Sequence, residues 1–141
     1  MKRTGSACWT GSLNDGKGVI STESGALTGE PFGAHTRFAD GSGTNPEELI
    51  GGAHAGCFVM ALSKELGAFG ITPGSLEAHA QVELVERDGG LAIARSDIAL
   101  TLEAGDADPA DIRSALKAAE KNCPVSAALN AEISIELTLQ T

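Results

Sequence analysis

Two stretches of the chain alternate apolar and polar residues, which is the pattern of a half-buried β-strand. Leu76–Glu86 alternates cleanly, and Leu91–Glu103 follows after Asp88-Gly89-Gly90, a sequence typical of a hairpin turn. We therefore expect these two strands to pair antiparallel. A last strand is predicted near the carboxyl end, where apolar residues alternate with polar ones at Ile133, Ile135, Leu137 and Leu139.

The segment Thr44–Leu66 predicts a helix, and from Ala53 to Leu62 it is apolar on nearly every side, so we expect this part to be buried. The start of the helix is well marked, because Asn45 is a good N-cap and Pro46 fits the first helical position. Each residue of the pair Gly51-Gly52 costs on the order of 1 kcal/mol of helix propensity, so we expect a break or kink there. One sheet hides only one flank of such a helix, so the sequence also suggests a partner subunit.

The rest of the chain predicts further short elements. Three strands separated by glycine-containing turns are expected at Cys8–Leu13, Gly18–Thr22 and Pro31–Phe38. Asp108-Pro109 starts a second helix as N-cap and first position, and Cys123-Pro124 ends it after about Lys121. This order of elements is α+β, without the strict βαβ alternation of a parallel sheet. With no internal repeat, low-complexity segment or linker, we expect one domain over residues 1–141.

Composition narrows the possible partners. The 141 residues include 19 Asp and Glu against 10 Lys and Arg, which gives a formal net charge of −9. Nucleic acid and anionic membranes need a concentrated basic patch, so we expect neither as a partner. No stretch approaches a transmembrane length and no apolar region follows the first basic residues, so we expect a cytoplasmic protein. In the cytoplasm a cysteine pair is more often catalytic, redox-active or metal-binding than a structural disulfide.

Cys57 in the central helix and Cys123 at the end of the second helix are the sharpest candidates for chemistry. A thiol pair can reduce a peroxide: one thiolate attacks the O–O bond and becomes a sulfenic acid, and the second thiol condenses with it into a disulfide. Two alternatives stay open on the residues alone. Both cysteines can be small packed residues. They can also join His54 as zinc ligands, although no fourth ligand stands at a recognisable spacing.

A reactive cysteine on a buried helix needs a cation beside it, because burial disfavours the thiolate. Arg37, just before the central helix, is the candidate, since its planar fork binds a carboxylate and still presents an N–H to sulfur. Glu48 is expected to orient Arg37, with Glu47 ranked second. On a straight helix, Glu48 and Cys57 lie on opposite faces and roughly 13 Å apart along the axis, so this role depends on the predicted break.

The chain resembles the OsmC/Ohr family of thiol peroxidases, and within it the osmotically inducible OsmC branch. Four motifs carry the resemblance: GTNPEELIGGAHAGCF, STESG (Ser21–Gly25), HTRF (His35–Phe38) and NCPVS (Asn122–Ser126). They stand in register over almost the whole chain. The resemblance implies an OsmC-like α+β fold with antiparallel, strongly curved sheets around buried central helices. It also implies an intertwined homodimer with two active sites at its interface.

The same resemblance implies a reaction, the reduction of organic hydroperoxides without metal, haem or flavin. Cys57 would attack the peroxide, and Arg37 would hold its thiolate while Glu48 orients Arg37. Cys123 would then form a disulfide with Cys57, and an external dithiol, such as a lipoylated protein, would reduce it. The resemblance connects this activity with oxidative and osmotic stress.

Two other functions remain as alternatives. One is a zinc-dependent hydrolase that uses His54, Cys57 and Cys123, and the other is a non-catalytic, stress-related dimer that binds small molecules. Cys8 departs from the family's pattern, and we expect it to be a small packed residue. Four apolar residues flank the proposed site and would favour an alkyl or fatty-acyl hydroperoxide, although each suits a core equally well: Phe32, Phe38, Phe58 and Met60.

Overall fold

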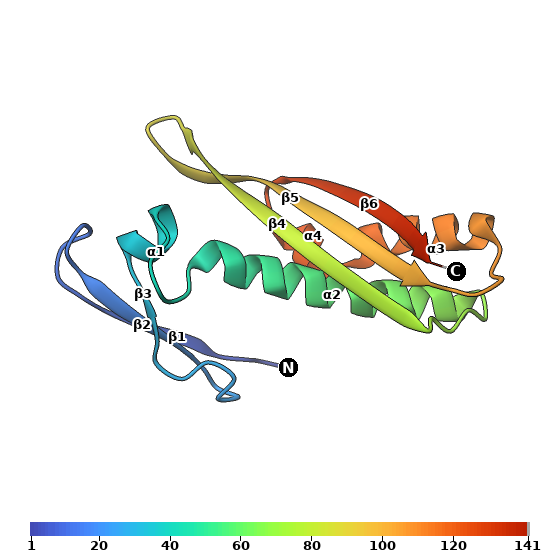
Figure 1. The fold of residues 1–141 in the computed structure, drawn as a ribbon, viewed down its shortest axis with the longest axis horizontal. Helices are drawn as coiled ribbons and strands as arrows, with labels where there is room; N and C mark the ends of the chain where they lie inside the picture. Colours follow the sequence, from blue (N-terminus) through green and yellow to red (C-terminus); the bar gives the residue numbers. More distant parts are fainter. Residues whose placement is uncertain (141) are drawn as a thin grey trace. The chain divides into compact units, whose positions relative to one another are not determined.

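The computed structural model describes residues 1–140, and the chain divides into two compact units, Met1–Leu49 and Ile50–Thr141. Figure 1 shows the elements in chain order. They are β1 (Gly5–Thr10), β2 (Lys17–Thr22), β3 (Glu30–Phe32), α1 (Ala34–Phe38), α2 (Pro46–Ala68), β4 (Ser75–Arg87), β5 (Gly90–Glu103), α3 (Pro109–Asn122), α4 (Pro124–Ala128) and β6 (Glu132–Gln140). The α+β class is confirmed, and the single domain stays a prediction.

The first unit contains an antiparallel sheet in the order β1-β2-β3. The strand predicted over Pro31–Phe38 is wrong in its second half, where α1 replaces it. The reason is local: Thr36 Oγ1 accepts the Gly33 N–H at 2.9 Å and donates to the Gly33 carbonyl at 3.0 Å, which draws the backbone out of the ladder. Cys8 pairs with Val19 across β1 and β2 and is exposed, so the expectation that it packs inside was also wrong.

Helix α2 begins where it was predicted. Asn45 Oδ1 accepts the backbone N–H of Glu48 at 2.9 Å, which is an N-cap bond. The expected break at Gly51-Gly52 is absent, because α2 runs unbroken through both glycines. Gly51 has a packing reason instead: a Cβ at this position would lie 2.8 Å from the carbonyl oxygen of Ala80, on β4. The glycine thus lets helix and strand approach closely.

Only one face of α2 is buried within the chain, where burial on all sides was expected. The buried residues recur at helical spacing: Gly51, His54, Phe58, Leu62 and Leu66. The opposite face is exposed and carries small and apolar residues, among them Gly52, Gly56 and Met60. The helix therefore has one buried face and one exposed face, and small or apolar residues occur on both.

The second unit has a mixed sheet in the order β4-β5-β6. Strands β4 and β5 form the predicted hairpin, and Asp88 and Gly89 at its tip have φ angles of 53° and 77°, as a two-residue type I′ turn requires. Strand β6 pairs parallel to β5, so the expectation of antiparallel sheets alone was wrong. The reason is the crossover through α3 and α4, which returns the chain in the same direction (Figure 1).

The core of the second unit lies between this sheet and the helices. Phe58 and Leu62 of α2 pack with Ile98 and Leu100 of β5, and the apolar face of α3 completes the cluster. Asp108 caps α3 as predicted, since its Oδ1 accepts the Ala110 N–H at 2.7 Å. Within residues 1–140, no helix combines the length and the apolar character that crossing a bilayer requires.

Candidate functional site

Cys57 and Cys123 lie together in the second unit, with their thiols within hydrogen-bond reach of each other. Cys57 sits on α2, and Cys123 is the residue between α3 and α4. Both are free thiols, and both belong to the same core cluster. Two residues 66 positions apart in the sequence thus meet in space, as the redox pair predicted from the sequence requires.

The two thiols differ in their acid–base properties. Burial raises the pKa of Cys57, and its hydrogen bond to Cys123 raises it further, against a hydrogen bond from the Val125 backbone. Burial also pushes the pKa of Cys123 upward, but hydrogen bonds from Ser126, Cys57 and Val125 outweigh it, and the net pKa is lowered. Within the chain, Cys123 is therefore the more acidic of the two thiols.

The more acidic thiol, Cys123, is the less accessible of the two. Cys57 is partly exposed, whereas Cys123 is 0% exposed beneath α2 and α4. Solvent therefore reaches the residue Cys57 but not Cys123. Of the two thiols, Cys57 is thus the more accessible and the one whose pKa is raised.

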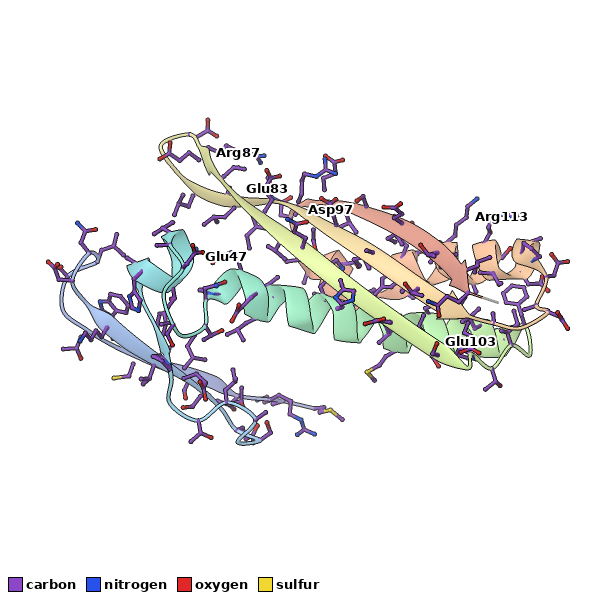
Figure 2. All side chains as sticks on the ribbon, in the orientation of Figure 1. Glu47, Glu83, Arg87, Asp97, Glu103 and Arg113 are labelled. Carbon is purple, nitrogen blue, oxygen red and sulfur yellow. The ribbon has the colours of Figure 1, made fainter. Side chains whose placement is uncertain are left out.

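Arg37 is held by a carboxylate in the first unit. Its Nη2 donates to Glu47 Oε1 at 2.6 Å and its Nε donates to the same oxygen at 3.0 Å. The Glu47 side chain, at the start of α2 (Figure 2), is only 12% exposed. This bidentate pair fixes the plane of the guanidinium, and Nη1 is left with no contact to Glu47.

Glu48 does not bind Arg37, so the ranking of Glu48 above Glu47 was wrong for this contact. Neighbouring helical residues point about 100° apart, and Glu48 turns toward Thr44, whose Oγ1 donates to Glu48 Oε1 at 2.6 Å. Asn45, the N-cap of α2, also contacts α1, since its Nδ2 donates to the Thr36 carbonyl at 3.2 Å. That bond ties the residue before Arg37 to the start of α2.

His54 is fully buried, as a packed and hydrogen-bonded histidine. Its Nδ1 lies 2.7 Å from Ser96 Oγ and its Nε2 lies 2.8 Å from Ser126 Oγ. Burial lowers its pKa, so the ring is neutral. Both nitrogens are occupied by serines, and among residues 1–140 no three His, Cys, Asp or Glu side chains gather as metal ligands. The zinc-site arrangement of His54 with the two cysteines is therefore disfavoured.

Sequence reasoning missed the two serines beside His54. A signal was present for Ser96, because it has the same alternation parity on β5 as Ile98, Leu100 and Leu102, which are buried. A serine on an apolar strand face needs a hydrogen-bond partner. Ser126 lies inside the NCPVS motif, but its contact with a residue 72 positions away follows only from the fold.

A second group of charged residues lies on the other face of the β4-β5-β6 sheet. Arg95 donates to Asp97 at 2.9 Å and to Glu132 at 3.2 Å, and Figure 2 shows Asp97 on β5. Hydrogen bonds from Arg95 and Ser134 lower the pKa of Asp97. These residues are solvated surface partners.

Comparison with known proteins gives consistent matches. The family model "OsmC-like protein" matches residues 39–138. Peroxiredoxin OsmC of Escherichia coli is 43% identical over 141 residues, which is 100% of this chain and 99% of that relative. The crystal structure of the organic hydroperoxide resistance protein OhrB of Bacillus subtilis superimposes with a TM-score of 0.71 at 28% identity, over 96% of this chain and 98% of that one. An OsmC-like protein from Mycoplasma pneumoniae shares the fold, with a TM-score of 0.76 at 16% identity over 100% and 99% of the two chains.

Proposed function

The chain belongs to the family of OsmC-like proteins, and from this membership and its paired thiols we infer that it is a thiol-dependent peroxidase that reduces organic hydroperoxides to alcohols. The observation that carries the inference is the contact between Cys57 and Cys123. Two relatives support the substrate class by name, Peroxiredoxin OsmC and the organic hydroperoxide resistance protein OhrB.

The proposed reaction starts at Cys57. Its thiolate attacks the terminal oxygen of the hydroperoxide, the O–O bond breaks, and the alkoxide leaves and takes up a proton to become the alcohol. The sulfur is oxidised by two electrons to a sulfenic acid, and the peroxide is reduced by the same two electrons. Cys123 then condenses with the sulfenic acid into a disulfide and one water. An external dithiol, such as a lipoylated protein, returns both thiols to the reduced state.

Arg37 is proposed to stabilise the Cys57 thiolate, since burial alone raises the pKa of that thiol. Its fork is already fixed by Glu47, which makes it a preorganised cation. Glu47 takes the orienting role that the sequence first gave to Glu48. We propose that Glu48 instead stabilises the start of α2 through Thr44, in the N-terminal turn where a negative charge is favourable.

We include a homodimer in the proposal. The exposed face of α2 centres on Met60, whose exposure is 75%, and it borders an open hollow of about 530 Å³ lined partly by Val59, Pro73 and Leu76. Soluble monomers rarely leave such apolar surface open, and the small residues Gly52 and Gly56 permit a second helix to approach closely. An intertwined dimer with strongly curved sheets, as the resemblance implies, would cover this face. In that dimer Arg37 serves the Cys57 of its own chain or of the partner.

The proposed substrate is an organic hydroperoxide, and the proposed compartment is the cytoplasm, where external dithiols keep thiols reduced. Of the apolar residues expected near the site, Phe58 is fully buried in the core, while Met60 and Phe38 are exposed. Phe38 is available to contact an alkyl group, whereas Met60 lies on the face proposed for the dimer interface. A link to oxidative and osmotic stress follows from the resemblance to the OsmC branch.

Mass spectrometry of the reduced chain after one equivalent of tert-butyl hydroperoxide tests this function, with hydrogen peroxide in parallel. We expect rapid formation of a Cys57–Cys123 disulfide, faster with the alkyl hydroperoxide, while the exposed Cys8 stays reduced. Slow oxidation spread over all three cysteines would overturn the peroxidase. It would favour a non-catalytic dimer that binds small molecules.

A further inference from the structure

His54 is a buried titratable residue that the proposed reaction does not use. It projects from the buried face of α2, and a serine hydroxyl lies within hydrogen-bond distance of each ring nitrogen. One hydroxyl comes from Ser96 on β5 and the other from Ser126 on α4. Three elements of the second unit thus converge on one imidazole, whose orientation is fixed by two short hydrogen bonds.

Ser126 connects this histidine to the resolving cysteine. Its backbone N–H donates to Cys123 Sγ at 3.5 Å. Its side chain also contributes to lowering the pKa of the Cys123 thiol. Cys123 in turn contacts Cys57. Hydrogen bonds therefore link Ser96 to His54 and His54 to the Ser126 hydroxyl, and the backbone N–H of the same serine donates to Cys123 Sγ.

Hydrogen-bond counting relates the tautomer of His54 to the donor role that Ser126 can take toward sulfur. A neutral imidazole has one N–H donor and one acceptor nitrogen, and a serine hydroxyl has a single proton to donate. If His54 Nε2 accepted that proton from Ser126, none would remain for the sulfur of Cys123. The Nε2–H tautomer leaves the Ser126 proton free for sulfur, and Nδ1 then accepts the hydroxyl proton of Ser96.

We propose that His54 and Ser126 are positioning residues for Cys123: His54 Nε2–H donates to Ser126 Oγ and thereby holds the Ser126 hydroxyl so that it donates to the Cys123 thiolate. The consequence for catalysis rests on the proposed peroxidase function, but the hydrogen-bond relay itself does not.

The relay acts on the steps in which Cys123 carries negative charge. When Cys123 resolves the sulfenic acid, the S–S bond forms and the S–O bond of Cys57 breaks. The hydroxide that leaves combines with the proton given up by the Cys123 thiol, and one water is released. When the external dithiol attacks the disulfide, the sulfur with the lower pKa is the better leaving group. The relay therefore directs the reductant to Cys57 and releases Cys123 as the thiolate.

The groups that face Cys123 come from all the elements packed around it. From α2 this is Cys57, which is titratable, and from α4 they are Ser126 and Val125, which are not. His54 of α2, also titratable, contacts Ser126. Behind His54, β5 contributes Ser96. On α3, the neighbouring Asn122 donates to Glu65 at 3.0 Å, so this carboxylate is already paired with an amide. A titration of Cys123 in the absence of Cys57 thus reports chiefly on Ser126 and His54.

The test is a thiolate titration of Cys123 by absorbance at 240 nm in a Cys8→Ser, Cys57→Ser background, where Cys123 is the only thiol. Adding Ser126→Ala should reduce the thiolate fraction at neutral pH about tenfold, because a hydrogen bond to a charged acceptor is worth roughly that factor. His54→Asn, whose amide is too short to reach Ser126, should act in the same direction. His54→Gln, whose amide N–H replaces Nε2–H, should restore most of the fraction. Ser114→Ala is the matched control, since Ser114 is exposed on α3 and donates to the Ala110 carbonyl.

A second measurement tests the tautomer directly. Imidazole nitrogen NMR of the reduced, otherwise unchanged chain should show a proton on Nε2 of His54 and none on Nδ1. Equal titration curves for Ser126→Ala and Ser114→Ala, or a proton on Nδ1, would overturn the relay. These readouts need no peroxide. A chain with the expected titration but no Cys57–Cys123 disulfide would overturn the peroxidase function and leave the relay standing.

Discussion

Arg37 and Glu47 form a bidentate ion pair in which two guanidinium nitrogens donate to the same carboxylate, at 2.6 and 3.0 Å. The two residues are ten positions apart, and the turn between them is held by Asn45, which caps α2 and also donates to the Thr36 carbonyl. Hydrogen bonds at the start of α2 therefore hold the segments that carry the two charged residues.

Glu47→Gln should lower kcat/KM for an organic hydroperoxide by about tenfold to a hundredfold, because a charge-assisted hydrogen bond that orients Arg37 is lost. Glu48→Gln is the matched control and should change kcat/KM less than about threefold, since Glu48 contacts Thr44 and not Arg37. Steady-state peroxidase assays of both variants make the comparison. A larger loss in Glu48→Gln would reverse the assignment of the two carboxylates.

The cysteine variants should fail in different ways. Cys57→Ser should abolish turnover, since the accessible nucleophile is gone. Cys123→Ser should consume one equivalent of hydroperoxide, stop, and accumulate over-oxidised Cys57, because no thiol is left to trap the sulfenic acid. Single-turnover kinetics with mass spectrometry would separate the two, and Cys8→Ser should behave as the unaltered chain. Full steady-state activity of Cys123→Ser would refute its resolving role.

The buried His54 predicts a loss of stability in mild acid. Burial holds its folded pKa below its unfolded value of about 6.5, so the unfolded chain binds more protons as the pH falls below that value. The stabilising contribution is complete above about pH 6.5 and is lost as the pH falls toward the folded pKa. The free energy of unfolding should therefore decrease by up to about 1.4 kcal/mol per pH unit in that range. Urea unfolding between pH 5 and 7.5 measures this slope, and His54→Gln should flatten it; an unchanged slope in the variant would assign it to other groups.

Two glycines of α2 should respond oppositely to alanine. Gly51→Ala places a Cβ 2.8 Å from the Ala80 carbonyl oxygen, and the strain should reduce the free energy of unfolding by about 1–3 kcal/mol. Gly67→Ala meets nothing within 4 Å and should be neutral or stabilise the chain by up to about 1 kcal/mol through helix propensity. Denaturant unfolding distinguishes them. A neutral Gly51→Ala would mean that β4 can move away from the helix.

The exposed face of α2 should mediate dimerisation. Met60→Lys places a charge in the centre of that face and should convert the dimer to monomer in sedimentation velocity runs at micromolar concentration. Leu139→Lys is the control, because Leu139 is 48% exposed on β6, away from α2 in the sequence. If Met60→Lys remained dimeric, the α2 face would not be the interface. A monomeric unaltered chain would remove the dimer from the proposal.

Local signals in the sequence were sufficient for the elements whose ends are set by neighbouring residues. Asn45 and Asp108 cap their helices because an N-cap bond spans only two or three residues. Asp88 and Gly89 form the hairpin turn because both tolerate positive φ. The choice of Cys57, Cys123 and Arg37 as candidates also came from the sequence, since their chemistry depends on residue type and motif.

Features that depend on contacts between distant segments required the tertiary structure. The glycines of α2 looked like a break, because helix propensity is local, and only the approach of Ala80 to Gly51 shows why the helix continues. The partner of Arg37 was ambiguous between two adjacent glutamates, and the direction of each side chain around the helix decided it. The link from His54 through Ser126 to Cys123 joins three elements. No spacing in the sequence encodes that link, because packing of α2 against β5 and α4 alone brings those atoms together.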